Sequence, residues 1–216
     1  NAVAARCETS PVQVGCQSVY RMNTAVGGNF GAFTTNRPVS IMKAMDVNYT
    51  IIGHCEERND KMGILAEAGV VDTKAVNRIL NQEIKLAVAN GMKVLYCIGE
   101  KDTELENWDE VLREQLEIGL EGVDKSQVVI GYEPIWSIGP GKTPAGKDYI
   151  TKIARFVKEV TGGIDVVYGG GLKVDNAEML ASIEEIDGGL IALTRFQGEI
   201  GFYPDEYIEI IRTYLG

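Results

Sequence analysis

Residues 127–143 read "QVVIGYEPIWSIGPGKT". A β-branched run, 127–132, ends directly at an acid, Glu133. Strands that end at such a residue are typical of α/β proteins, whose sites gather where strands end and the following loops begin. The fold therefore depends on whether the same pattern occurs elsewhere in the chain.

Short β-branched runs alternate with longer segments of helical period along the whole chain. Residues 73–90 are the clearest helix, with apolar side chains spaced along one face and Gly91 as a stop signal. This alternation predicts βαβ units and a parallel sheet. The expected strands are 12–19, 49–53, 93–98, 127–132, 165–168 and 189–193, and the expected helices are 73–90, 109–119, 145–160, 175–182 and 204–214.

Unusual residues follow the other strand-like runs as well. His54 follows "YTIIG", "GE" follows "LYCI", "GGG" follows "VVY" and "TRF" follows "LIAL". An open doubly wound sheet would carry G-x-G-x-x-G after an early strand, and this chain has none. The pattern favours an α/β barrel of eight βα units, with residues 1–216 as a single domain holding strands three to eight. Since a barrel must close to hide its edges, we expect about two further βα units upstream.

Composition excludes several classes of partner. The net charge is −10 and no basic run occurs, which argues against binding to nucleic acid or to an acidic membrane surface. No apolar stretch has the length of a membrane span. The cysteines are scattered without C-x-x-C spacing, so we expect neither a disulfide framework nor a metal site, and a reducing, cytoplasmic setting. They are Cys7, Cys16, Cys55 and Cys97.

The segment Gly-Lys-Thr, 141–143, suggests a nucleotide-binding phosphate loop. That loop requires a glycine five residues before its Gly-Lys pair, and Trp136 occupies this position. An indole there prevents the backbone from wrapping a phosphate, so we set the nucleotide hypothesis aside.

Glu133 allows two interpretations. A carboxylate at the end of a buried strand is costly unless it is paired with a base or used in chemistry. The loop after it favours chemistry, because stiff ends and an apolar middle suit a lid that closes over a substrate and expels water. The expected lid consists of Pro134, Ile135, Trp136, Ser137, Ile138, Gly139, Pro140, Gly141 and Lys142.

Two further elements accompany Glu133. His54, the only histidine, is followed by Glu56 and Arg58, and it is either a satisfied polar residue or an electrophile for a carbonyl oxygen. The glycines after Tyr168 form either a tight turn or an anion site made of backbone amides. Together these elements predict acid–base chemistry on a small phosphorylated carbonyl compound.

The motifs resemble those of the triose-phosphate isomerase family, in its order and at roughly its spacing, from about residue 12 to the end. The resemblance implies a (βα)8 TIM barrel, usually a homodimer, that interconverts dihydroxyacetone phosphate and glyceraldehyde 3-phosphate in glycolysis and gluconeogenesis without a cofactor. The matching segments are "GAFT" (31–34), "IGHCEER" (52–58), "CIGE" (97–100), "YEPIWSIGPGKT" (132–143), "YGGGLKVDNAEML" (168–180) and "IDGGLI" (186–191).

The resemblance also implies roles for single residues. Glu133 is similar to the family's base and His54 to its neutral electrophile. The other matched positions are Glu56 as the acid beside the site, Cys97 as the cysteine at a strand end, Gly139 as the lid amide that contacts phosphate, Gly170 and Gly171 as the second phosphate loop, and Thr34 as the dimer-loop threonine.

Departures from the family pattern leave two alternatives open. The family's lysine, in an Asn-x-Lys after the first strand, has no counterpart, and Ala192 and Leu193 replace the glycine pair of the last phosphate loop. Arg195 can supply a charge-assisted contact to phosphate instead. One alternative is therefore a paralogue acting on a larger substrate such as a tetrulose phosphate, and the other is a non-catalytic homologue with a binding role.

Overall fold

The structure is a computed structural model, and it describes residues 10–31, 33, 35–139 and 141–216. The chain divides into two compact units. The first comprises Asn1–Cys97 and Glu117–Val129, and the second comprises Ile98–Leu116 and Ile130–Gly216. Each unit is described by itself below.

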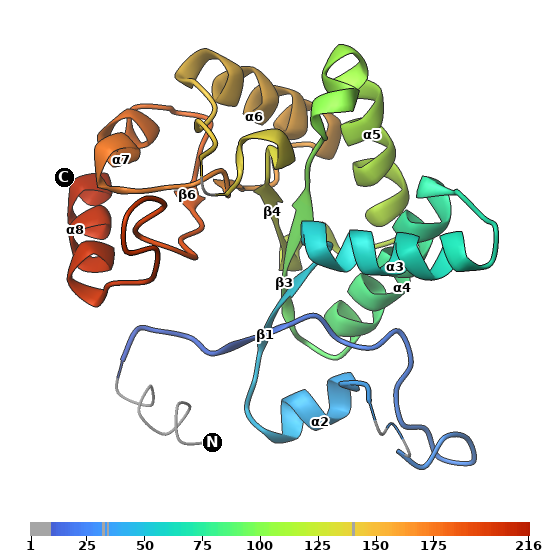
Figure 1. Cartoon of the computed structure of the whole chain (residues 1–216). Helices are drawn as coiled ribbons and strands as arrows, with labels where there is room; N and C mark the ends of the chain where they lie inside the picture. Colours follow the sequence, from blue (N-terminus) through green and yellow to red (C-terminus); the bar gives the residue numbers. More distant parts are fainter. Residues whose placement is uncertain (1–9, 32, 34, 140) are drawn as a thin grey trace. The chain divides into compact units, whose positions relative to one another are not determined.

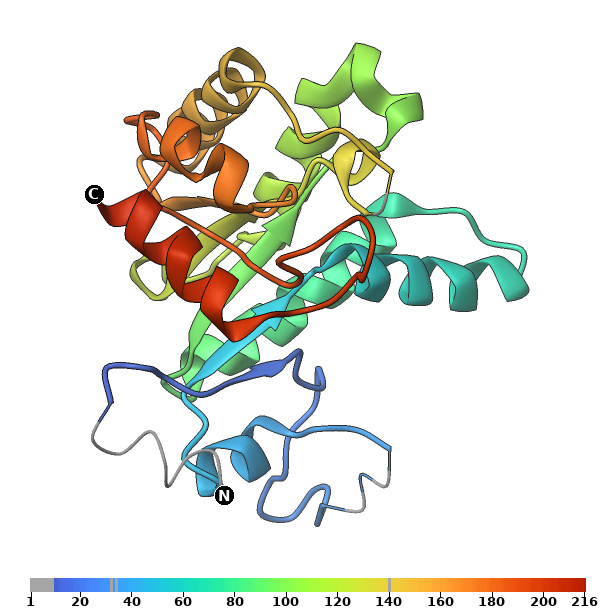
Figure 2. The same cartoon turned by 60° about the vertical axis from the view of Figure 1, so that its left-hand side comes forward.

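The first unit holds parallel strands that follow one another in sequence order. Strand β1 (Gly15–Gln17) pairs with β2 (Tyr49–Ile52), and β2 pairs with β3 (Lys93–Ile98). Gly15 lies opposite Tyr49, which in turn lies opposite Lys93. The helices are α2 (Val39–Ala44), α3 (Cys55–Glu67) and α4 (Thr73–Ala89), with the short 3-10 helix η2 at Lys125–Gln127. Figures 1 and 2 show α3 and α4 side by side.

The second unit repeats the same arrangement. Strand β4 (Val128–Tyr132) pairs in parallel with β5 (Val166–Tyr168), and β5 pairs with β6 (Gly188–Gly189). Helices α7 (Val174–Ala181) and α8 (Pro204–Leu215) lie side by side, and a long loop joins β6 to α8 (Figure 2). The remaining elements are α5 (Trp108–Gly119), α6 (Lys147–Thr161) and the 3-10 helices η1 (Asp102–Asn107) and η3 (Ile135–Ser137).

The expected strands and helices are confirmed, with differences at their ends. Strand β1 covers only the middle of the expected 12–19, and β6 ends before most of the expected 189–193. Helix α4 begins at the expected residue because the Asp72 side chain accepts a hydrogen bond from the Ala75 amide at 3.0 Å. Leu80 and Ile84 on its apolar face are fully buried. The alternation of parallel strands and helices confirms the α/β class.

Helices α2 and α3 were not expected from the sequence. Helix α3 buries none of its residues, so its sequence lacks the apolar stripe by which a helix is recognised. Helix α2 has only six residues, which is too short to show a period. Among the described residues, no helix has the length and apolar character that a membrane crossing requires.

The described cysteines differ in burial. Cys97 is fully buried in β3, whereas Cys16 and Cys55 are half-buried, and no disulfide joins these three. Cys7 lies outside the described residues.

A charged cluster lies between α3 and α4. The Lys61 ammonium is 2.9 Å from a Glu57 carboxylate oxygen and 3.1 Å from Glu83 Oε1. Glu83 is 3% exposed, and among the described residues its Oε2 has no hydrogen-bond partner. Burial, and then the negative charge of Glu57, raises the pKa of Glu83 to about 8.

Glu83→Gln is expected to change how stability depends on pH. Because the folded-state pKa of Glu83 lies above its ordinary value of 4.5, the folded protein holds this proton more tightly, and stability falls as pH rises from 4.5 toward 8. Glutamine does not ionise, so the variant does not lose stability in this way. The free energy of unfolding of Glu83→Gln, relative to wild type, should therefore rise with pH by on the order of 2–4 kcal/mol, and the full rise is reached above pH 8. Urea denaturation between pH 5 and 9 measures it. Glu67→Gln, at an exposed position of α3, is the control. The expectation would be wrong if the free energies of unfolding of wild type and Glu83→Gln changed with pH in parallel.

Candidate active site

Glu133 follows β4 directly and is 3% exposed. Its backbone amide donates to the Ile98 carbonyl at 2.8 Å. Gly99 makes this approach possible, since a Cβ there would lie 1.8 Å from the Glu133 carbonyl oxygen. The Gln115 side chain fixes Gly99 by accepting from its amide and donating to its carbonyl, both at 2.9 Å. Backbone contacts at the end of β3 therefore set the position of Glu133.

The expected lid begins as an ordered turn. Residues Ile135–Ser137 form η3, and the Ser137 amide and hydroxyl both donate to the Pro134 carbonyl, at 2.8 and 3.0 Å. Gly139 and Gly141 have φ of +110° and +77°, which side chains rarely tolerate. Pro140 lies outside the described residues. These glycines lie near the end of residues 134–142, the segment that the sequence predicts to be a lid, and they allow backbone conformations there that other residues rarely adopt.

A pocket of about 220 Å³, here called the lid pocket, joins the lid to the loops after β5 and β6. The expected phosphate contacts Gly139, Gly171 and Arg195 all line it, whereas Glu133 and Gly170 do not. Its lining residues are Ser137, Gly139, Gly141, Lys142, Pro144, Gly171, Lys173, Asp175, Thr194, Arg195, Phe196 and Gln197.

The charges of the lid pocket suit an anion. Lys142, Lys173 and Arg195 bring positive charge, against the single carboxylate of Asp175, which lies 3.4 Å from the Lys173 ammonium. Arg195 is oriented by Glu206, whose carboxylate is 2.5 Å from its Nε, and by the Tyr203 ring 3.9 Å from its guanidinium. The pocket can therefore hold a phosphate group by charged side chains as well as by glycine backbone.

The glycine loop after β5 serves two purposes. Gly170 is required by close packing, because a Cβ there would lie 2.2 Å from the Tyr168 hydroxyl, which donates to the Gly170 carbonyl at 2.8 Å. Gly171 has φ of +84° and lines the lid pocket. Of the two glycines, only Gly171 is placed to meet a ligand in this pocket.

His54 and Glu56 belong to the first unit and contact each other. His54 precedes α3, and its Nδ1 pairs with Glu56 Oε2, which also accepts from the Cys55 thiol at 3.0 Å. Burial acts to raise the pKa of Glu56, but the hydrogen bonds from Cys55 and from its own backbone, with the charge of His54, outweigh it and hold this pKa below its usual value. Pairing with a carboxylate favours a proton on His54 Nδ1.

Hydrogen bonds from Arg58 stabilise the turn before His54. Gly53 has φ of +86°, and a Cβ there would lie 2.8 Å from the Cys97 carbonyl oxygen. The turn is therefore tied closely to β3. The Arg58 guanidinium donates to Gly53 O at 2.8 Å, Asn77 Oδ1 at 2.7 Å, Tyr96 Oη at 3.0 Å and Cys97 O at 2.9 Å.

Comparison with known proteins agrees with these motifs. A family model described as Triosephosphate isomerase matches residues 1–212. The chain belongs to the triosephosphate isomerase family, which is a family of isomerases. This membership confirms the expected TIM-barrel class of fold.

Curated relatives carry the same name. The triosephosphate isomerase of Mycoplasmopsis pulmonis is 32% identical over 84% of the chain and 66% of its own length. That of Synechococcus sp. strain CC9902 is 32% identical over 97% and 78%, and that of Chlorobium luteolum is 37% identical over 74% and 64%. The chain thus matches between 64% and 78% of the length of these triosephosphate isomerases.

Sequence reasoning missed the central acid of the second unit. Glu100 is fully buried, and its Oε1 accepts from the Trp136 indole at 2.8 Å and from the Tyr132 and Tyr149 hydroxyls at 2.9 and 3.0 Å. Burial raises the pKa of Glu100, against the lowering effect of these donors. The sequence places "GE", which includes Glu100, after a strand, but the hydrogen-bond partners of Glu100 are visible only in the fold.

Gly169 was also missed. A Cβ at this position would lie 3.1 Å from Glu133 Cγ, so the first glycine of "YGGG" leaves room for the Glu133 side chain. Thr34, expected in the dimer loop, lies outside the described residues.

Arg195→Met is expected to weaken binding of inorganic phosphate by about five- to fifteenfold, because it removes one charge-assisted contact. Calorimetric titration of the purified protein with phosphate measures the affinity. Arg155→Met is the matched control, since Arg155 pairs with Glu185 and does not line the lid pocket. Equal losses in the two variants would show that Arg195 acts only through net charge.

The proton of His54 is expected on Nδ1 in the protein without substrate. His54 is the only histidine, so ¹⁵N spectra of the imidazole contain a single set of signals. Glu56→Gln should reduce the share of this tautomer, because a neutral amide attracts the N–H less strongly than a carboxylate does. A proton found mainly on Nε2 in wild type would contradict the observed pairing.

Proposed function

We propose that the protein is a cofactor-independent aldose–ketose isomerase that interconverts dihydroxyacetone phosphate and glyceraldehyde 3-phosphate. The observation that carries this proposal is the placement of Glu133. Its carboxylate is buried just after the end of β4, and the chain continues directly into η3 and the residues that line the lid pocket. The candidate base and the candidate anion site therefore belong to one unit of a triosephosphate isomerase family member.

Glu133 acts as the base. Its carboxylate takes a proton from the carbon next to the substrate carbonyl, which leaves an enediolate, and returns it to the neighbouring carbon. The proton held by the Glu133 carboxyl exchanges in part with solvent before a proton reaches the second carbon, and the hydroxyl proton of the first carbon moves to the oxygen on the second. The two carbons thus exchange oxidation states, and no electron acceptor is consumed. Burial keeps water away from the carboxylate and strengthens its interaction with the substrate.

The phosphate group is held in the lid pocket. Gly139 and Gly171 offer backbone close to the ligand, and Arg195 supplies the charge that the glycine pair of the last loop cannot. His54 polarises the carbonyl oxygen, with Glu56 beside it. In a neutral imidazole with its proton on Nδ1, Nε2 is an acceptor, so donation from Nε2 requires either a change of tautomer or a protonated ring.

We also propose a homodimer in the cytoplasm. The dimer rests on the resemblance of the motifs to those of the family, and the scattered cysteines fit a reducing compartment. The relatives described above are named triosephosphate isomerase, so they favour neither a larger ketose phosphate nor a non-catalytic role.

Glu133→Gln is expected to lower turnover by about 10²–10⁴-fold, because it removes the general base. Incorporation of deuterium from solvent into dihydroxyacetone phosphate, followed by proton NMR, measures the proton transfer directly. Glu184→Gln, at an exposed position, is the control and should retain full activity. A wild-type protein that exchanges no hydrogen with solvent would refute the proposed isomerase.

A further inference from the structure

Tyr149 occupies the first turn of α6, just beyond the lid, and is half-buried. Its hydroxyl donates to Glu100 Oε1 at 3.0 Å. Its ring meets the Trp136 ring edge to face, with centroids 5.5 Å apart and planes at 86°. Tyr149 thus contacts both the lid tryptophan and the carboxylate that holds it.

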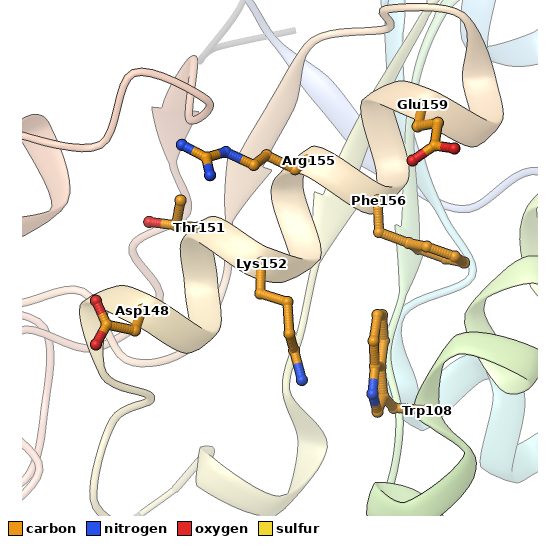
Figure 3. A pocket seen from close by; sticks show the side chains of 7 residues that line it. All are labelled: Trp108, Asp148, Thr151, Lys152, Arg155, Phe156 and Glu159. Atoms are coloured by element: carbon orange, nitrogen blue, oxygen red, sulfur yellow. The ribbon is translucent and has the colours of Figure 1, made fainter.

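The Tyr149 ring is also in contact with Lys152. The Lys152 ammonium lies 4.5 Å from the centre of the Tyr149 ring and 4.3 Å from that of Trp108, and Figure 3 shows this side chain extending toward Trp108. A cation over two aromatic rings holds both in place. Lys152 also lines a surface pocket of about 500 Å³ together with Trp108, Asp148, Thr151, Arg155, Phe156 and Glu159.

Glu100 is bound unevenly. The Tyr132, Trp136 and Tyr149 donors all reach Oε1, whereas Oε2 is buried and has no hydrogen-bond partner among the described residues. A carboxylate oxygen offers about two lone pairs, so three donors compete for them. Burial and the nearby Glu100 raise the pKa of Tyr149, and its hydroxyl therefore keeps its proton and remains a donor.

We propose that Tyr149 is a positioning residue whose hydroxyl competes with the Trp136 indole for Glu100 Oε1 and so speeds the departure of Trp136 from the position seen here. The inference rests on the proposed function in that it assigns residues 134–142 the role of a lid. When Trp136 leaves, the hydroxyls of Tyr132 and Tyr149 still satisfy Oε1. Without the Tyr149 hydroxyl, a single donor would remain on a fully buried carboxylate, which is costly.

The release of Trp136 is linked to turnover because Trp136 lies close to Glu133 in the sequence. Tyr132 immediately precedes Glu133, and Trp136 lies in η3, three residues after it. Any movement of residues 135–137 that carries Trp136 away must break its bond to Glu100. The strength of that bond therefore limits how fast the lid exchanges between positions.

The test uses Tyr149→Phe in the full chain, which retains the ring and removes only the hydroxyl. The chain has two tryptophans, and Trp108→Phe assigns their indole N–H signals in ¹H–¹⁵N spectra. In Tyr149→Phe, the Trp136 N–H signal should move downfield as its bond to Glu100 tightens. Its exchange rate from relaxation dispersion, and kcat, should both fall by about three- to tenfold. Tyr214→Phe, a half-buried tyrosine of α8, is the matched control and should leave the Trp136 signal in place.

The outcomes separate this inference from the proposed function. An unmoved or upfield-shifted Trp136 signal, or an unchanged exchange rate, overturns the competition between donors. An unchanged kcat with slower exchange overturns the link to turnover. A wild-type protein without isomerase activity whose Trp136 signal still moves downfield in Tyr149→Phe refutes the proposed function and upholds the competition at Glu100.

Discussion

The second unit depends on one buried carboxylate, that of Glu100. Its Oε1 gathers donors from the end of β4, from η3 and from α6, and its backbone carbonyl accepts from the Ile135 amide at 3.1 Å. A buried acid left without these partners would cost several kcal/mol, on the order of 3–5 kcal/mol. The same bonds therefore join the residue before Glu133, the start of the lid and the helix beyond it, and they hold the chain around the candidate base in one arrangement.

The two units support their candidate residues by different means. His54 follows a glycine turn that is tied by Arg58 to the carbonyl groups of Gly53 and Cys97, while Glu133 is placed by backbone contact with Ile98 and by the absence of a side chain at Gly99. In both cases a glycine brings two segments closer than any other residue permits.

Sequence patterns predicted the alternating strands and helices, and the candidate site residues that follow the ends of the strands. Strands β3 and β4 were recognisable because most of their residues are buried on both faces, and α4 because its apolar face is continuous. Helix α3 was missed because it buries no residue, and Glu100 was given no role because its three donors are 32, 36 and 49 residues away in sequence. Contacts of this kind leave no local pattern, so they become visible only in three dimensions.

The construction of the lid pocket bears on how such a protein can change its substrate. The position of the base is set by main-chain atoms and by a glycine whose replacement would force a Cβ to within 1.8 Å of a carbonyl oxygen. The loop between β6 and α8 instead contributes Thr194, Arg195, Phe196 and Gln197 to the lining of the lid pocket. Exchanging these side chains would alter the size and charge of the accepted molecule without displacing Glu133, so chemistry and selectivity can diverge independently in this scaffold.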